Sequence, residues 1–387
     1  MQPSRCSTAP SLMTHHDPRT ILIAPDSFKG SLTSVEVATA LRDGWLRARR
    51  DDDVLLAPLA DGGEGTLVAI AAAGGWEWQE TRVHDPIGRL VTARWLRSSD
   101  GRSAVVELAE ASGLSRLTKD ELDPMRATTF GTGEILCAVV DAGVEHVTLG
   151  IGGSATNDGA AGILRALGAT INDDEVDLTG LEPRLAQVDL RIACDVTNPL
   201  LGPRGAAATY GPQKGATSDQ VEELDRRLAR YADHLEAASG RQERDTPGAG
   251  AAGGTGFGLL CLTDRFRSLE LVPGVELVMA DVDLDGKLNH ADLVITGEGR
   301  IDEQTGYGKT ALGVAKRAAA AGVPCVAVGG GVTPEGIEAL AAVGAVAVPV
   351  VERPQSVEEA MAAGIPPVER CGERLACLIS LSATING

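Results

Sequence analysis

The residues with the most evident chemical potential lie between His146 and Gly159, where an apolar strand leads into a loop of small and polar residues. A helix is expected to begin near Ala160. Backbone N–H groups and the positive end of a helix dipole would then face one spot, as in phosphate sites. The loop also carries polar side chains, including Ser154, Asn157 and Asp158. This arrangement predicts phosphoryl transfer. The alternative is a tight turn in which Asn157 or Asp158 only caps the helix.

Three further loops carry charged residues, and each follows a predicted strand. They span Asp26–Thr33, Asp61–Gly65 and Gly297–Asp302. Ligands of open α/β sheets bind at the carboxyl ends of the parallel strands, so we expect the three loops to meet at one edge. Capping and turn formation explain any single loop equally well. Together, the carboxylates, Lys29 and Arg300 exceed what turns require.

A fourth group of polar residues lies in the middle of the chain. Asp195 and Asn198 follow a predicted strand, and Arg204 and Lys214 come soon after them in glycine-bearing backbone. A carboxylate, an amide and two cations in this setting suit an alcohol substrate or a metal–phosphate complex. The six histidines show no triad or metal spacing, and none lies in these loops. Histidine is therefore a poor catalytic candidate.

Three familiar motifs match the sequence but not its context. The glycines between positions 248 and 253 satisfy G-x-G-x-x-G without a preceding strand, which leaves a lid, a close-approach loop or a linker as options. Gly306–Thr310 ends like a P-loop but lacks its first glycine, and Lys309 remains a candidate phosphate contact between a strand and a helix. Asp281–Gly286 resembles the start of a calcium loop, yet we expect strands at its flanks instead of EF-hand helices.

Alternating strands and helices at both ends of the chain predict an α/β fold with a doubly wound, mostly parallel sheet. The expected strands there span 20–24, 54–58, 292–296, 324–329 and 345–350, and the expected helices 35–49, 310–321, 334–343 and about 367–382. Between the two ends, extended stretches at 80–83, 91–97 and 103–108 predict an antiparallel meander. After it we expect helices at 131–142 and 218–238 and a strand at 190–196.

These elements predict a nested organisation with a hinge where two linkers run side by side. We expect a disordered extension over residues 1–19 and a discontinuous sheet domain over 20–75 plus 288–387. An inserted mixed α/β domain is expected over 76–287, with the active site in the cleft between the two domains.

The 387-residue chain has 54 acidic and 35 basic residues, a formal net charge of −19. Such a surface repels nucleic acid and anionic lipid, so local cations and N–H groups must attract any anionic ligand. The seven scattered cysteines favour reduced thiols. No apolar run approaches the ~18 residues that a membrane span needs. We therefore expect a cytoplasmic protein that binds neither nucleic acid nor membrane.

Six blocks, in order along the chain, resemble those of the bacterial-type two-domain glycerate kinases (class I glycerate 2-kinases). They are Ala24–Lys29, Ala60–Thr66, Gly150–Gly159, Ala193–Pro199, Gly211–Thr217 and Asp292–Asp302. The resemblance implies a flavodoxin-like domain with a large inserted domain and an active site between them. It also implies transfer of the γ-phosphate of ATP to D-glycerate, giving 2-phosphoglycerate, with Mg²⁺. The oligomeric state stays open, with a homodimer as one option.

Phosphoryl transfer requires positioning, neutralisation of charge and a base near the attacking hydroxyl, which assigns roles to the candidate residues. Asp195 is expected to act as the base or a metal ligand, and Lys29 and Asn198 complete the catalytic group. The candidate contacts of the nucleotide are Gly152, Gly153, Ser154, Asn157, Lys214 and Lys309. The candidate contacts of the substrate are Ser27, Asp61, Gly63 and Arg300. The candidate Mg²⁺ ligands are Glu64, Glu298 and Asp302, not all direct because Mg²⁺ retains waters.

Two other functions remain open. The motifs specify phosphoryl transfer better than they specify the acceptor, so a kinase of another small hydroxy acid is an alternative. A catalytically silent ligand-binding regulator descended from such a kinase is the other. The complete set of lysines and carboxylates argues against the regulator.

Overall fold

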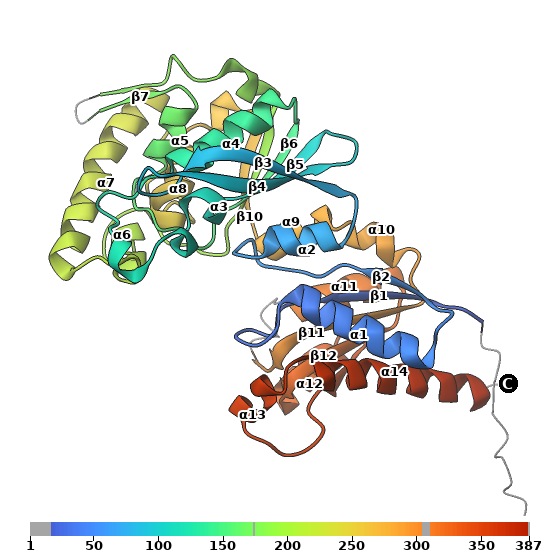
Figure 1. Cartoon of the computed structure of the whole chain (residues 1–387). Coiled ribbons are helices and arrows are strands. Elements are labelled where there is room, and N and C mark those ends of the chain that lie inside the picture. The colour runs from blue at the N-terminus through green and yellow to red at the C-terminus, as the bar shows by residue number, and fades with distance from the viewer. Residues whose placement is uncertain (1–16, 173–174, 304–309, 386–387) are drawn as a thin grey trace, which may run out of the picture.

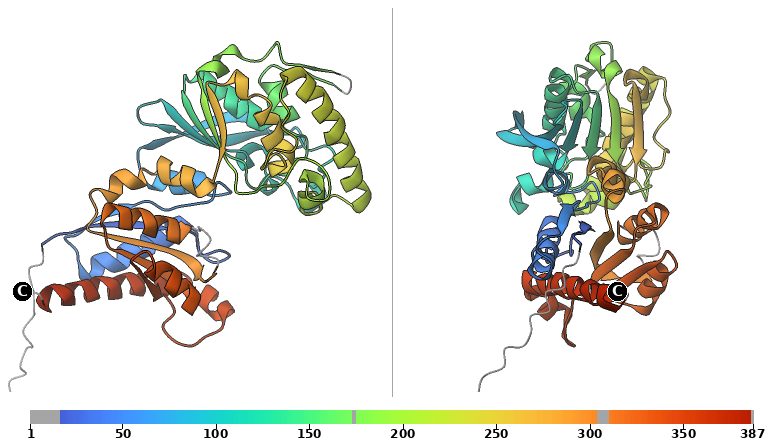
Figure 2. Two further views of the ribbon diagram at one scale, coloured as in Figure 1. Left: turned by 180° about the vertical axis from the view of Figure 1, so that it is seen from behind. Right: turned by 90° about the vertical axis from the view of Figure 1, so that its right-hand side faces the viewer.

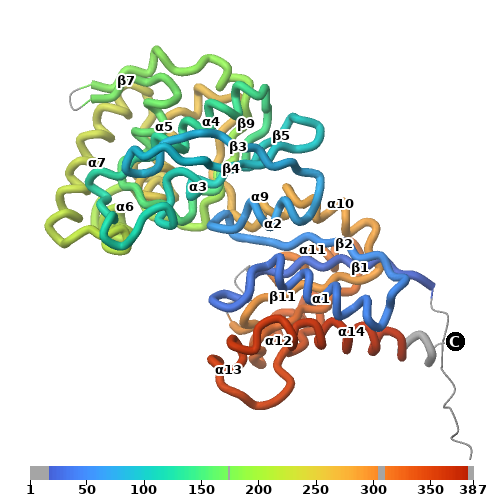
Figure 3. The backbone as a smooth tube through the Cα atoms, viewed as in Figure 1, coloured from blue at the N-terminus to red at the C-terminus, as the bar shows by residue number. Residues whose placement is uncertain are grey.

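Two β-sheets organise the structure, one in each half of the molecule, with a layer of short helices between them (Figure 1). The structure is a computed structural model that describes residues 17–172, 175–303 and 310–385. Both ends of the chain build the lower half in this view, and the middle of the chain builds the upper half. The tube in Figure 3 passes upward after α2 (Thr66–Ala72) and returns before α9 (Gly274–Asp281).

The lower sheet has five parallel strands in the order β13-β12-β11-β1-β2. Its strands are β1 (Thr20–Pro25), β2 (Asp53–Leu56), β11 (Leu293–Ile301), β12 (Cys325–Val332) and β13 (Ala345–Pro349). Numbered along the chain, this is the 2-1-3-4-5 order of flavodoxin-like sheets. Helices cover both of its faces. The predicted doubly wound, flavodoxin-like α/β fold is therefore confirmed.

The covering helices are α1 (Ser34–Ala48), α11 (Thr310–Ala321), α12 (Pro334–Ala341) and α14 (Ile365–Ile385), with the short α13 (Val357–Ala362) before the last. Successive side chains of a strand point to opposite faces of the sheet. Ile21 and Ile23 of β1 accordingly share a core with α1 and α14, whereas Leu22 and Ala24 share one with α11 and α12. This apolar run can therefore form only a strand covered on both sides.

The upper sheet has six strands in the order β10-β9-β6-β5-β4-β3. They are β3 (Trp76–His84), β4 (Leu90–Ser98), β5 (Ser103–Glu107), β6 (His146–Gly150), β9 (Asp189–Ala193) and β10 (Ser268–Val272). The first three along the chain pair antiparallel, as the predicted meander requires, and the last four pair parallel. The large insertion is thus a mixed α/β unit, as predicted.

Six helices belong to this upper half. They are α3 (Ala109–Ser112), α4 (Phe130–Asp141), α5 (Ala161–Ala166), α6 (Ala206–Tyr210), α7 (Ser218–Ser239) and α8 (Ala251–Leu260). The small ladder of β7 (Thr170–Ile171) and β8 (Val176–Asp177) lies beside them. The longest helix, α7, begins with a capping box between Thr217 and Gln220, which satisfies N–H groups of its first turn.

One apolar core runs through the junction between the halves. It joins Leu22 of β1, Leu67 of α2 and Val278 of α9 to Leu96 of β4 and Val105 of β5. The helices α2, α9 and α10 (Leu284–Leu288) form the layer seen between the sheets from behind in Figure 2. The two halves therefore share buried surface at the junction, and hinge motion stays a prediction.

Three segments differ from expectation. β11 continues to Ile301 instead of ending near Thr296, because its last residues pair with the extended glycine run of β12. Asp281–Gly286 runs from the last residue of α9 into α10, so its flanks are helices and not strands. Residues 248–258 are neither lid nor linker, because most of them are buried and several approach other backbone closely. The predicted close approach to other backbone is observed, but most of the stretch forms α8, with a kink at Ala252–Gly254, instead of a loop.

Two further properties concern the described residues as a whole. None of the helices in these ranges is long and apolar enough to cross a membrane. The described cysteines are free thiols, as their scattered positions indicate. Five of them show a raised pKa because of burial: Cys137, Cys194, Cys261, Cys325 and Cys371.

Gly274→Ala tests the close packing at the junction. A Cβ atom at this position would lie 1.9 Å from the carbonyl oxygen of Asp61, so the loop and α9 must separate. We expect a loss of about 1–3 kcal/mol in the free energy of unfolding, measured by urea denaturation. Gly313→Ala is the matched control, because its Cβ would meet only the flexible end of Met279, at 3.2 Å. Equal losses in both variants would contradict the prediction.

Candidate active site

The loop Asp61–Gly65, which follows β2, is the point where the two sheets meet. A Cβ on Gly150, the last residue of β6, would lie 2.6 Å from the carbonyl oxygen of Gly62. A Cβ on Gly152 would lie 2.6 Å from the Cα of Gly63. Only glycine permits such approach of backbone to backbone. The carboxyl ends of the parallel strands in both sheets therefore share one junction, which is where α/β folds bind ligands.

Three aspartates gather at this junction, each following a strand. Asp26 lies after β1, Asp61 after β2 and Asp195 after β9. Burial raises the pKa of Asp26, and the charge of Asp61 raises it further. Hydrogen bonds from the Thr310 hydroxyl and the Ser27 N–H, both at 2.6 Å, act in the opposite direction and lower it. Asp61 acts on Asp195 in the same direction. The side chain of Asp61 thus lies within electrostatic reach of carboxylates from both sheets.

Asp195 lies beside the start of α9. Its Oδ1 accepts the N–H of Gly274 at 2.9 Å. Although the residue is exposed, surrounding protein removes part of its hydration, and this loss raises its pKa, with a further contribution from Asp61. The hydrogen bond from Gly274 opposes the shift. A rigidly held carboxylate that takes up a proton more readily than a free aspartate is suited to general-base catalysis.

The third predicted loop meets the first at the rim of the junction. A Cβ on Gly299 would lie 3.3 Å from the backbone nitrogen of Lys29, so β11 passes beside the loop that carries this exposed lysine. Arg300 is exposed and pairs with Asp302 at 3.2 Å. Glu298 is buried within β11. Because the strand continues through this segment, Glu298 and Arg300 are strand residues and not loop residues.

The polar side chains of the glycine-rich loop face inward. Ser154, Thr156 and Asn157 are all buried, whereas Gly152 and Gly153 reach solvent. Neither side-chain atom of Asn157 has a hydrogen-bond partner within the described part of the chain. The structure therefore offers the backbone of Gly152 and Gly153, and not the side chains of Ser154 and Asn157, at the surface of the junction.

Lys214 lies beneath this loop. Its side chain is 1% exposed, and its Nζ donates hydrogen bonds to the Ser154 hydroxyl at 2.7 Å and the Thr156 carbonyl oxygen at 2.6 Å. Burial lowers the pKa of Lys214 to about 7, and the nearby Asp158 opposes the shift. The predicted phosphate contact is thus a buried support of the loop, because the short 212–214 turn directs it into the core.

Asp158 follows the capping alternative. Its Oδ2 accepts hydrogen bonds from the N–H of Gly162 at 3.1 Å and from the N–H and hydroxyl of Thr129 at 2.9 and 3.0 Å. It therefore joins the first turns of α5 and α4. The capping alternative therefore holds at Asp158, whereas a phosphate site at the partly exposed Gly152 and the exposed Gly153 stays a prediction.

Asn198 and Lys309 are two other predicted site residues. Asn198 donates to the Arg204 carbonyl oxygen at 2.7 Å and accepts from the Tyr210 hydroxyl at 2.9 Å, so its amide holds its own loop together. This engagement leaves little capacity for substrate. Lys309 lies outside the described residues.

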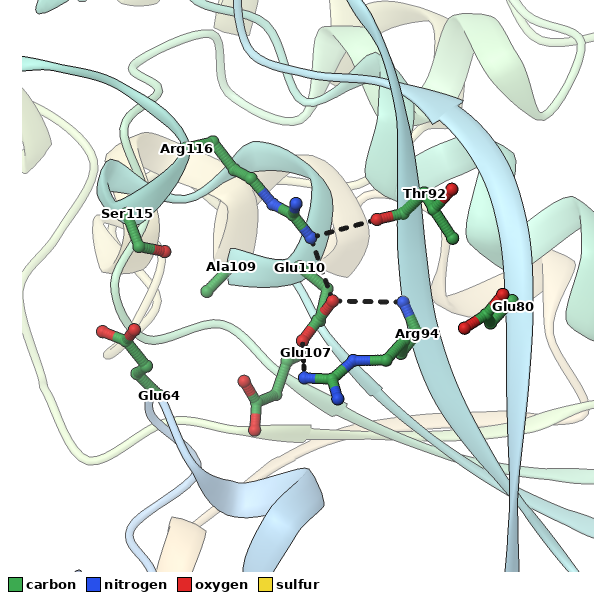
Figure 4. Close-up of a pocket in the computed structure, with 9 residues that line it drawn as sticks. All are labelled: Glu64, Glu80, Thr92, Arg94, Glu107, Ala109, Glu110, Ser115 and Arg116. Carbon is green, nitrogen blue, oxygen red and sulfur yellow. Dashed lines mark hydrogen bonds and ion pairs between the residues drawn. The ribbon is translucent and has the colours of Figure 1, made fainter.

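Sequence reasoning missed Glu107, the last residue of β5. It lines a pocket of about 450 Å³ together with Glu64 and the ion-paired Arg94, Glu110 and Arg116 (Figure 4). Burial raises the pKa of Glu107 to about 7; hydrogen bonds from the N–H groups of Leu67 and Gly65 lower it, and the charges of Glu110 and Glu64 raise it. The sequence feature that could have identified Glu107 is its place as a carboxylate at the end of an apolar strand, Ser103–Glu107.

The predicted magnesium ligands do not form a preassembled site. Within residues 17–172, 175–303 and 310–385, no three acidic, histidine or cysteine side chains are close enough to hold a metal. Glu64 lines the pocket of Glu107, whereas Glu298 and Asp302 lie on or after β11. A Mg²⁺ ion here would need oxygens from elsewhere, as Mg²⁺ sites that use substrate phosphates and waters do.

The glycerate kinase family model matches residues 21–380 of the chain. The chain belongs to this family. It is 43% identical over 378 residues to a glycerate kinase of Halalkalibacterium halodurans, covering 93% of this chain and 98% of the relative. It is 41% identical over 329 residues to the glycerate 2-kinase of Escherichia coli K12, covering 81% and 85%. A crystal structure from Salmonella typhimurium LT2 described as glycerate kinase 2 matches with a TM-score of 0.81 at 39% identity, covering 95% and 100%.

Glu107→Gln should change stability in a pH-dependent way. The folded protein holds the Glu107 proton more tightly than the unfolded chain does, because the pKa rises from 4.5 to about 7. Stability therefore falls as pH rises through this window and is constant above it. Glutamine removes the buried charge, so we expect a gain of about 1–3 kcal/mol at pH 8 that disappears near pH 4.5.

Urea denaturation at the two pH values measures this gain. Glu80→Gln, an exposed carboxylate that lines the same pocket, is the control and should leave the stability unchanged at both. A Glu107→Gln effect of equal size at both pH values would show that the charge is not responsible.

Proposed function

We propose that this protein catalyses the ATP-dependent phosphorylation of D-glycerate to 2-phosphoglycerate. The observation that supports it most is the meeting of Asp26, Asp61 and Asp195 with the exposed Gly152–Gly153 backbone at one junction. This provides a base, negative charge for a metal ion and N–H groups for phosphate, which are the parts that phosphoryl transfer needs. Membership of the glycerate kinase family supports the choice of acceptor, and the glycerate 2-kinase relative supports the 2-position.

In this proposal Asp195 accepts the proton of the glycerate hydroxyl as it attacks the γ-phosphate. Its position directly after β9 and its hydrogen bond from Gly274 fix the carboxylate, so little reorganisation is needed at the moment of transfer. Its raised pKa favours proton uptake. Lys29 and Arg300 at the rim supply positive charge for the carboxylate of glycerate or for phosphate oxygens.

A Mg²⁺ ion that the phosphates of ATP also coordinate would fit the carboxylates at the junction. Asp61 raises the pKa of two neighbouring carboxylates, so negative charge is concentrated where a cation would be stabilised. Asp61, with or without Asp26, would hold the ion, which would neutralise the charge of the phosphates, while Asp195 remains available as the base. This set replaces Glu64, Glu298 and Asp302 as our proposed ligands.

We propose that the substrates occupy the cleft between residues 20–75 plus 288–387 and residues 76–287. A cytoplasmic location and a homodimeric state stay predictions.

A coupled assay of ADP release with and without D-glycerate tests the function. We expect release that depends on D-glycerate and on Mg²⁺, and a phosphorus NMR spectrum of the product that matches 2-phosphoglycerate. Faster release with another small hydroxy acid would assign a different acceptor. Binding of ATP without any release would indicate the silent regulator.

Asp195→Asn tests the general base. The amide preserves the shape of the carboxylate but cannot take up the proton, so we expect kcat to fall by about two orders of magnitude or more with the melting temperature unchanged. Asp177→Asn, at the end of β8 in the upper half, serves as the control and should retain full turnover. Wild-type turnover in the Asp195 variant would remove this residue from the base role.

Lys29→Ala tests the cationic rim. Because Lys29 is exposed, we expect an increase of about tenfold in the KM of an anionic substrate with little change in melting temperature. Lys119→Ala, another exposed lysine outside the junction, controls for the loss of surface charge. A drop in thermal stability that accompanies the change in KM would instead identify Lys29 as a structural residue.

A further inference from the structure

The first turn of α2 lacks a cap of its own. Its N-cap residue is Gly65, which adopts φ of 94° and carries no side chain to accept the N–H groups that every helix start leaves unpaired. The first turn contains no acidic residue either. The N–H of Thr66 bonds to the carbonyl oxygen of Gly63 at 3.3 Å, within the same loop. The N–H of the buried Leu67 needs an acceptor from another part of the chain.

Glu107 provides this acceptor from the other half of the molecule. Its Oε1 accepts the N–H of Leu67 at 2.6 Å, and the backbone of Gly65 lies close enough to lower the pKa of the carboxyl group. Glu107 ends β5 in the upper sheet, whereas Gly65 and Leu67 belong to the start of α2, which lies in the helical layer between the two sheets (Figure 1). Figure 4 shows its carboxylate near the segment that carries Glu64 into α2.

The capped turn is the end of the loop that forms the junction. Gly65 closes the segment Asp61–Gly65, whose other members contact Gly150 and Gly152 of the upper half. At the opposite end of the segment, a Cβ on Gly274 would lie 1.9 Å from the Asp61 carbonyl oxygen. The loop is therefore fixed at both ends by groups that follow strands of the upper sheet.

We propose that Glu107 is a positioning residue for phosphoryl transfer, because its carboxylate caps α2 across the junction and keeps Asp61 aligned with Asp195. This inference rests on the proposed function. A neutral side chain would avoid a buried charge that also faces Glu64 and Glu110. The buried charge lowers the stability of the folded protein, so its presence indicates that Glu107 serves the geometry of the loop and not stability.

Turnover of Glu107→Gln and Glu107→Ala tests the proposal. Glutamine offers one acceptor oxygen where the carboxylate offers two, and alanine offers none. Because displacements near 1 Å reduce catalysis strongly, we expect kcat to fall about tenfold in the glutamine variant and about 100-fold in the alanine variant. The KM values for ATP and D-glycerate should change less than threefold, since Glu107 is proposed to act through the loop.

Comparison with stability separates positioning from a purely structural role. At pH 8 the melting temperature should follow the order Gln above Glu above Ala, whereas kcat should follow Glu above Gln above Ala. Glu80→Gln, at an exposed position on the same pocket, should keep wild-type values of both. A glutamine variant with wild-type kcat, or a kcat order that follows the melting temperatures, would overturn the proposal.

Hydrogen–deuterium exchange gives a readout that does not depend on activity. In the alanine variant we expect faster exchange in the peptide that spans residues 61–67, with exchange of β13 unchanged. Unchanged exchange at 61–67 would overturn the cap itself. Failure of the wild-type protein to phosphorylate D-glycerate would contradict the proposed function. The exchange result would still show whether the cap exists.

Discussion

Contact between the backbone of the Asp61–Gly65 loop and the strand ends of the upper sheet is the constraint on which the rest of the structure depends. Glycine at positions 62, 150, 152 and 274 removes the side chains that would keep the two halves apart. Because of this approach, Asp26 and Asp195 come within electrostatic reach of one residue, Asp61, although they are far apart along the chain. The candidate site exists only when both sheets are assembled, and neither half contains it alone.

The charges at the junction oppose stability and support function. Asp26 and Asp195 have a raised pKa mainly because burial disfavours their ionised forms, and Asp61 repels both. A protein selected for stability alone would replace such carboxylates with neutral residues. Their concentration next to an exposed N–H surface is the pattern expected of a site that becomes balanced when a cation and an anionic substrate bind.

The sequence allowed accurate prediction where the local pattern determines the structure. Ile21–Ala24 is apolar at every position, which is explained only by a strand buried on both faces, and the sheet order follows from such strands and their helical crossovers. The loops 26–33, 61–65 and 297–302 were predicted to meet at one edge, and the structure brings Asp26 near Asp61 and Gly299 beside Lys29. Strand ends are visible in a sequence because the apolar run stops there.

The remainder could not be predicted because it depends on contacts between distant segments. Nothing near Lys214 in the sequence shows that its ammonium group turns inward to Ser154, 60 residues earlier. Glu107 ends an apolar strand in the same way as many surface carboxylates, and only the uncapped start of α2 gives it a role. The extension of β11 to Ile301 likewise requires the partner strand β12, whose glycines do not indicate a strand by themselves.

The inward orientation of Lys214 determines how phosphate charge would be neutralised. With a pKa lowered to about 7 and 1% exposure, this lysine contributes little positive charge to the surface of the junction. The glycine-rich loop then provides N–H groups from Gly152 and Gly153 but no cation. Positive charge must come from outside the loop, from Lys29 and Arg300 at the rim and from a metal ion that arrives with the nucleotide. In this arrangement the glycine-rich loop of the upper half orients the phosphates, and the cations beside the lower sheet neutralise their charge. Phosphoryl transfer would therefore need both sheets.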